Sequence, residues 1–109
     1  GEDDSTFFAY VTADDLAQGT GYQNLTNYSG NAADESINGT LWLFNPSNTT
    51  YVKHFYATLS ANDAGSGTAQ SEDNVFIGGY VNSTSDIDAV DFKMDSGNFD
   101  GTIKLYGVG

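Results

Sequence analysis

The sequence predicts a single all-β domain, an antiparallel β-sandwich or barrel of about seven or eight strands. Apolar residues recur at every second position through most of the chain, and turn residues separate these segments. Helix signals are nearly missing, because the one candidate, residues 13–18, is too short for more than a turn. A chain of 109 residues is long enough for one core and too short for two, so we expect one domain over residues 1–109.

The first expected strands cover residues 7–12 and, more weakly, residues 22–28. The clearest expected strand is residues 37–44 (INGTLWLF), where Ile37, Leu41 and Leu43 share one face while Trp42 and Phe44 share the other. Because apolar residues occupy both faces, the pattern is typical of a central strand that is covered on two sides. Trp42 is accordingly interpreted as a core residue.

A hairpin is expected next, because residues 45–48 (NPSN) stop the strand with turn chemistry. Proline at the second position presets φ for a type I turn, and asparagine suits the flanking positions. The alternation then resumes in residues 51–59 (YVKHFYATL), which predicts the second strand of the hairpin.

Residues 60–73 (SANDAGSGTAQSED) are rich in small and acidic residues, and this composition predicts a surface loop that crosses between two sheets. Another strand is expected at residues 75–81 (VFIGGYV). There the pair Gly78-Gly79 indicates either a bulge or a close approach by another backbone.

Two further strands are expected in the last part of the chain. In residues 87–94 (IDAVDFKM), the side chains expected to point inward are Val90, Phe92 and Met94, and those expected to point outward are Asp91 and Lys93. In residues 102–108, Ile103 and Leu105 are expected to face the core while Lys104 points to solvent. A terminal strand of this kind pins the chain end to a sheet.

Charge and composition exclude several functions. Fifteen acidic residues face three lysines, which gives a formal net charge of −12 and predicts no binding to nucleic acid or to an anionic membrane surface. Cysteine is absent, so disulfides and thiolate zinc sites are excluded. The longest apolar stretch, residues 7–11, is far too short to span a membrane.

No catalytic signature is visible, and we expect a protein that is not an enzyme. The only histidine, His54, lies mid-strand among aromatic residues, and no nucleophile elbow accompanies it. It is interpreted as a surface or interface histidine. Paired carboxylates for glycoside hydrolysis are not expected either, because Asp88 and Asp91 look solvated. The three glutamates, all in expected loops or at the terminus, are Glu2, Glu35 and Glu72.

We expect no cofactor, with one weak alternative. Residues 96–101 (SGNFDG) partly follow the calcium loop of an EF-hand, but serine stands at the first ligand position and Gly107 stands where the bidentate glutamate belongs. An EF-hand is therefore rejected. A looser calcium site stays open as an alternative, formed either by Asp95, Asn98 and Asp100 or by Asp86 and Asp88.

Carbohydrate binding is the more serious alternative, since β-sandwich modules hold sugars on exposed aromatic rings with asparagine and aspartate nearby. The tyrosines are better placed than Trp42, because a phenol can lie half-buried with its hydroxyl in water. We therefore select Tyr51, Tyr56 and Tyr80 as candidate contacts to a glycan or a protein partner.

The end of the chain carries a resemblance to a known class of proteins. Residues 99–108 (FDGTIKLYGV) resemble the "f-x-G-[ST]-x-x-LYG-[IV]" ending of tailed-phage virion proteins with β-sandwich, jelly-roll-like domains. Residues 41–45 followed by Tyr51 look like the hairpin of those proteins, and residues 87–90 look like their "I-x-x-I" strand. The resemblance extends from about residue 37 to the end.

The resemblance implies a non-enzymatic protein of the virion surface, either a capsid decoration or a fibre component. Its expected partners are other virion proteins, in a homo-oligomer or attached to a capsid lattice, with a host glycan as an additional partner. Its expected location is the extracellular surface of the virion. The alternative function is a carbohydrate-binding module or adhesin domain of a microbial surface protein.

Overall fold

A computed structural model describes residues 10–27, 29–63 and 71–109. Its regular elements are the short 3-10 helix η1 (Thr12–Asp14) and the strands β1 (Ile37–Leu43), β2 (Lys53–Asp63) and β3 (Ser71–Val81). The all-β prediction is confirmed at this level, since strands form nearly all the regular structure of the described residues.

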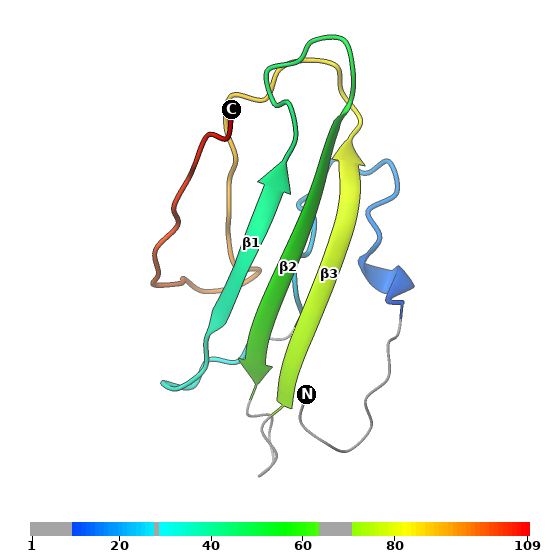
Figure 1. The fold of residues 1–109 in the computed structure, drawn as a ribbon. Helices are drawn as coiled ribbons and strands as arrows, with labels where there is room; N and C mark the ends of the chain where they lie inside the picture. Colours follow the sequence, from blue (N-terminus) through cyan, green and yellow to red (C-terminus); the bar gives the residue numbers. More distant parts are fainter. Residues whose placement is uncertain (1–9, 28, 64–70) are drawn as a thin grey trace.

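The three strands form one antiparallel sheet in the order β1-β2-β3, so that β2 is central (Figure 1). The first pairing runs from Ile37↔Ala61 to Leu43↔Phe55. The second runs along the full length of both strands, from Lys53↔Val81 to Asp63↔Ser71. β1 pairs only with β2 among the described strands, so the expectation of a central strand at residues 37–44 is wrong.

The predicted hairpin between β1 and β2 is confirmed, and the local sequence explains it. The Asn48 N–H donates a hydrogen bond to the Asn45 carbonyl at 3.0 Å, which closes the four-residue turn around Pro46. The Asn48 side-chain oxygen then accepts hydrogen bonds from the backbone N–H groups of Thr50 and Tyr51, at 2.7 and 2.8 Å. Asparagine thus organises the turn and the chain that leaves it.

The two faces of the sheet differ in burial. In all three strands the odd-numbered residues point to one face, here called the inner face, and the even-numbered residues point to the other, the outer face. The buried residues Lys53, Ala57 and Ala61 all lie on the inner face of β2. In β3, the odd positions from Asp73 to Gly79 are half-buried and the even positions are exposed, while Val81 at the end of the strand is also exposed. The core therefore lies against the inner face.

The segment that follows β3, residues 82–87, contacts the inner-face residue Lys53 and the hairpin turn. The Lys53 ammonium donates hydrogen bonds to the carbonyls of Ser83, at 3.3 Å, and Ser85. The Ile87 N–H donates to the Pro46 carbonyl at 2.8 Å, which ties this segment to the hairpin turn. In Figure 1, extended chain from before β1 and from after β3 runs behind the sheet.

The strands expected at residues 87–94 and 102–108 do not form. Ile103 is 59% exposed and Leu105 is 94% exposed, so the prediction that they face the core is wrong. Alternation alone does not make a strand, because a strand needs a neighbour for its backbone hydrogen bonds. None of residues 88–109 makes a backbone hydrogen bond to another described residue. Lys104 is exposed, as expected.

The expectation for side chains within residues 87–94 is partly correct. Phe92 and Met94 are half-buried while Asp91 and Lys93 are exposed, in agreement with the predicted alternation. Val90, expected to point inward, is about half exposed. The alternation of burial is therefore present without the strand.

The two strands expected near the N-terminus, at residues 7–12 and 22–28, are not seen in the described residues. Most of the strand expected at residues 7–12 lies outside the described residues, and its described end enters η1. Residues 22–27 form no strand.

The loop expected at residues 60–73 is shorter than predicted, because β2 continues to Asp63 and β3 begins at Ser71. The expectation that it crosses between two sheets is wrong, since β2 and β3 are paired neighbours in one sheet. The remainder of the loop, residues 64–70, lies outside the described residues. The strands extend into polar sequence because their pairing is continuous to the ends, which satisfies the backbone hydrogen bonds there. The even-numbered polar residues Asn62, Glu72 and Asn74 also lie on the outer face, which is open to water.

No bulge forms at Gly78-Gly79, since the register runs through both residues without interruption. The alternative expectation, a close approach by another backbone, is not met either, because the near neighbour of Gly79 is a side chain. A Cβ atom at Gly79 would lie 3.0 Å from the Phe55 ring.

Candidate binding face

A cluster of aromatic rings covers one end of the outer face. Trp42 of β1 and Tyr56 of β2 are directly paired, with ring centroids 6.3 Å apart and planes 17° apart. Tyr56 also lies against Phe44, at a centroid distance of 6.0 Å and an interplanar angle of 28°. These three near-parallel rings are called the ring cluster below.

Trp42 is 42% exposed, so its interpretation as a core residue is wrong. The reason lies in the sheet, because Trp42 points to the outer face and no described segment buries that face. Phe44 and Tyr56 are exposed to a similar extent. The ring cluster is therefore packed within itself and open to water on its far side.

Further rings lie beside this cluster on the same face. His54 and Tyr80 are paired across β2 and β3, with ring centroids 5.9 Å apart. His54 is exposed, as the sequence predicted. Phe76 of β3 is 74% exposed. An exposed patch of apolar and aromatic side chains is typical of a surface that binds a ligand or a partner.

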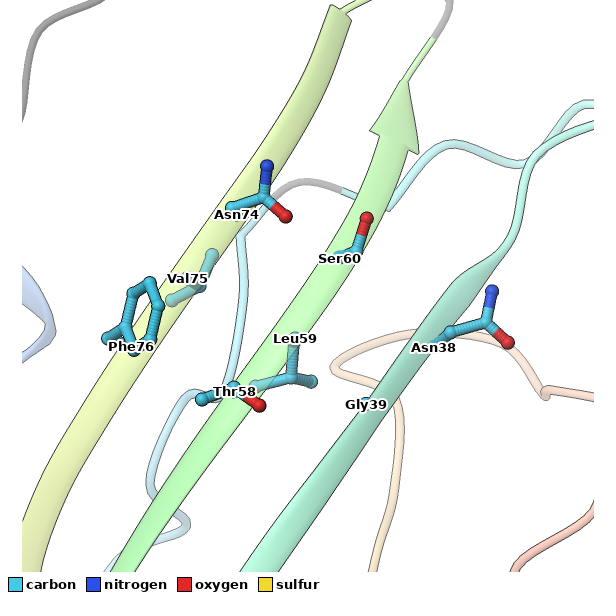
Figure 2. Close-up of a pocket in the computed structure, with 8 residues that line it drawn as sticks. All are labelled: Asn38, Gly39, Thr58, Leu59, Ser60, Asn74, Val75 and Phe76. Atoms are coloured by element: carbon cyan, nitrogen blue, oxygen red, sulfur yellow. The ribbon is translucent and has the colours of Figure 1, made fainter. Parts of the chain in front are cut away.

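Next to the rings, the outer face is hollowed by a shallow depression of about 250 Å³ (Figure 2). Its outer-face side chains come from all three strands, and they are Asn38, Thr58, Ser60, Asn74 and Phe76. The hollow exists because the central strand carries the short side chains of Thr58 and Ser60 between longer neighbours. Figure 2 shows Phe76 on one flank and Asn38 on the other.

Several polar groups around the hollow and the ring cluster have no protein partner among the described residues. They are the side-chain amides of Asn38 and Asn74, the Thr58 hydroxyl, the Trp42 indole N–H and the Tyr56 hydroxyl. In contrast, the Ser60 hydroxyl donates to the Glu72 carboxylate at 3.0 Å. The outer face thus offers both hydrogen-bond donors and acceptors beside exposed rings.

The outer face is almost free of charge, although the chain carries a net charge of −12. Glu72 is the only carboxylate at the described even-numbered positions of the three strands, and it lies at the end away from the ring cluster. Lys53 points to the inner face, and the other two lysines lie outside the strands. A neutral surface therefore interrupts a strongly acidic molecule.

The structure brings two of the three candidate contact residues to this face. Tyr56 belongs to the ring cluster and Tyr80 lies diagonally beside it. Tyr51 is 71% exposed, but it lies in the connection between β1 and β2 and not in a strand of the sheet.

Sequence reasoning missed the remaining members of the face, which are Phe44, Phe76, Asn38, Thr58 and Asn74, and it interpreted Trp42 as core. The signal was present as parity, because strict alternation around the Asn45–Asn48 turn places Trp42 and Tyr56 on the same face. What alternation cannot report is which of the two faces is covered.

The catalytic and metal candidates are not gathered into a site. Within the part of the chain that the structure describes, no three His, Asp or Glu side chains lie where they could hold a metal ion. Asn98 and Asp100, two of the calcium candidates, line an open hollow of about 620 Å³ with Phe92 and Lys93. Asp91 instead accepts a hydrogen bond from the Tyr22 hydroxyl.

Two tyrosines outside the face are coupled to carboxylates. The Tyr22 pKa is raised above its ordinary value by the hydrogen bond to Asp91 and, next, by the charge of that carboxylate. The Tyr10 pKa is raised in the same way by Asp15, at a distance of 2.6 Å. The Lys93 ammonium lies 4.4 Å from the centre of the Tyr22 ring, which adds a cation–π contact.

Comparisons with known proteins add no relatives, since no protein-family model, no curated protein and no solved structure matches the chain. None of the described residues belongs to a helix with the length and apolar character that crossing a membrane requires.

Proposed function

We propose that this chain is a non-enzymatic surface protein of a tailed-phage virion, either a capsid decoration or a fibre component. The observation that carries the proposal is the state of residues 102–108, which are strand-like in sequence, exposed, and without a backbone partner among the described residues. An unpaired segment of this kind pairs readily with the sheet edge of another protein. The same residues carry the resemblance to virion proteins.

The proposal includes a finer fold for the assembled protein. Residues 87–94 and 102–108 form strands on contact with neighbouring copies, and this completes a jelly-roll-like β-sandwich of about seven or eight strands. The alternating burial of Phe92 and Met94 against Asp91 and Lys93 supports it, because the side chains already have the periodicity of a strand. Partners are then other virion proteins and further copies of the chain.

The acidic surface suits an extracellular location on a particle. A net charge of −12 repels the packaged DNA and the polyanions of lysed cells, and it keeps copies soluble before assembly. The proposal assigns no nucleic-acid ligand, no membrane contact, no cofactor and no catalytic residue.

Particle association tests the proposal. An antibody against the chain is expected to label purified particles at defined positions in negative-stain images. A chain truncated before Thr102 is expected to stay soluble and to be lost from particles, because it lacks the segment that pairs with its neighbours. A Lys104→Gln chain, which keeps the apolar alternation, serves as the control and should incorporate. Unlabelled particles, or full incorporation of the truncated chain, would contradict the proposal.

A second candidate function is a carbohydrate-binding module or adhesin of a microbial surface. The ring cluster and the neighbouring hollow favour it, since exposed rings beside free amide groups are a common design for sugar sites. Glycan binding without any particle association would decide for this candidate.

A further inference from the structure

We infer that the outer face of the sheet is a binding site for a neutral oligosaccharide. Sugar rings stack on the ring cluster, and their hydroxyl groups bond to Asn38, Thr58 and Asn74 in the hollow. The inference does not depend on the virion role, because the same face serves a chain held on a virion or on a microbial surface. It rests on the second candidate function and deepens it by naming the class of sugar and the residues that hold it.

The ring cluster supplies the apolar half of such a site. Trp42 and Tyr56 are held near parallel by their cross-strand contact, so their orientation is fixed before any ligand arrives. Nearly half of the Trp42 surface is nevertheless exposed. Pyranose rings present a face of C–H groups, and such a face packs on an aromatic ring without losing the hydration of its hydroxyls.

The hollow supplies the polar half. The amides of Asn38 and Asn74 come from opposite edges of the sheet and the Thr58 hydroxyl lies between them, on the central strand. None of the three has a hydrogen-bond partner among the described residues. A sugar carries hydroxyls around its rim, so it can meet these groups while its ring stacks on the aromatic side chains.

Charge selects the class of oligosaccharide. Among the described strand residues, the face carries one carboxylate, Glu72, at its far end, and His54 as its one basic side chain, so no lysine or arginine is there to pair with a sulfate, a phosphate or a carboxylate. The field of the surrounding −12 chain repels such groups further. Neutral sugars need no cationic partner, and the acidic chain does not repel them.

Size argues against a protein as the occupant. β1 has seven residues, and it therefore limits the region in which all three strands lie side by side. This region is about 23 Å long and about 14 Å across, which is a flat area of roughly 300 Å². A standard protein interface needs about 800 Å² on each partner. The three-stranded part of the face is thus small for a standard protein interface, whereas a short run of sugar rings fits on it.

Titration of the full chain with neutral oligosaccharides tests the inference. The probes are cellohexaose, maltohexaose, mannohexaose and chitohexaose, with an oligogalacturonate as the anionic control. Trp42 is the only tryptophan, so its fluorescence reports directly on the face, and calorimetry gives the affinity independently. At least one neutral probe is expected to bind saturably and to change the Trp42 emission, while the oligogalacturonate leaves it unchanged.

Variants locate the site. Tyr56→Ala is expected to weaken binding by about tenfold, through loss of one stacking ring. Phe76→Ala is a second probe of the same face, and it spares the fold because Phe76 is largely exposed. Tyr106→Ala is the matched control, since Tyr106 is equally exposed and lies outside the sheet, and it should bind like the unchanged chain.

Three titration results would overturn the inference, and a fourth result comes from dilution of the protein alone. The three are no binding of any neutral probe, equal binding of the anionic probe, and binding that survives both Tyr56→Ala and Phe76→Ala. A Trp42 emission that changes with protein concentration alone would show that a second copy covers the face, and would overturn it too. None of these results bears on particle association, so this inference and the virion proposal fail separately.

Discussion

Trp42 shows at the scale of one residue how environment, and not residue type, sets the role of a side chain. Its partners are Tyr56 across the strand pair and water beyond it. A cross-strand pair contributes about 0.2–1 kcal/mol and an aromatic contact about 0.5–1.5 kcal/mol. A tryptophan in a core costs about 3–5 kcal/mol when it is truncated to alanine.

Trp42→Ala is therefore expected to lower the free energy of unfolding by about 1–2 kcal/mol, measured by urea denaturation of both chains. A loss in the range of a core tryptophan would show that another part of the chain covers the outer face.

Tyr22 links the N-terminal segment to residues 87–94 through its hydrogen bond to Asp91. The phenol donates only while it is protonated, and its pKa is raised above the ordinary value of 10.0. Its contribution to stability is then fully present below about pH 10 and is lost as the pH rises through the folded-state pKa.

The stability difference between the unchanged chain and Tyr22→Phe is expected to be constant near neutral pH and to narrow in alkaline solution. Urea unfolding over a series of pH values measures it. Tyr106→Phe is the control, because the Tyr106 hydroxyl has no partner among the described residues. A Tyr22→Phe difference that does not vary with pH would contradict the assigned hydrogen bond.

At the scale of the elements, β1 and β2 approach closely on the inner face, and glycine permits the approach. A Cβ atom at Gly39 would lie 2.6 Å from the Thr58 carbonyl oxygen and 2.9 Å from the Leu59 side chain. Gly78, on the outer face of β3, would meet nothing within 4 Å. The two glycines thus lie in the same sheet under opposite steric conditions.

Gly39→Ala is expected to destabilise the protein by about 2 kcal/mol through overpacking, since backbone atoms cannot move aside cheaply. Gly78→Ala is its matched control and should be neutral or stabilising by about 0.5 kcal/mol, because alanine restricts the unfolded chain more than glycine does. Thermal unfolding compares the two. Equal effects would show that the β1–β2 register is different.

The elements also show what local sequence can predict. The hairpin could be predicted because proline and asparagine determine its turn within four residues, and the alternation on each side then sets the faces. The lengths of β2 and β3 could not, because their polar ends are held by pairing with each other. Local propensity at Ser60 or Asn74 contains no information about that partner.

At the scale of the whole molecule, the sequence could not predict which face of the sheet is covered by other chain segments. The residues of the ring cluster could be grouped from parity alone, but whether they are core or surface depends on which chain segments lie over the outer face. The alternating pattern of residues 102–108 predicts a strand but does not identify its partner. The pattern is the same whether the partner strand belongs to the same chain or to another.

Acrylamide quenching of Trp42 fluorescence tests the central claim, that the outer face of the sheet is open, most directly. We predict efficient quenching and an emission maximum shifted toward that of hydrated indole, unchanged when the protein is diluted. A blue-shifted emission that acrylamide does not quench, at every protein concentration, would contradict the claim. It would show that Trp42 is buried in a core.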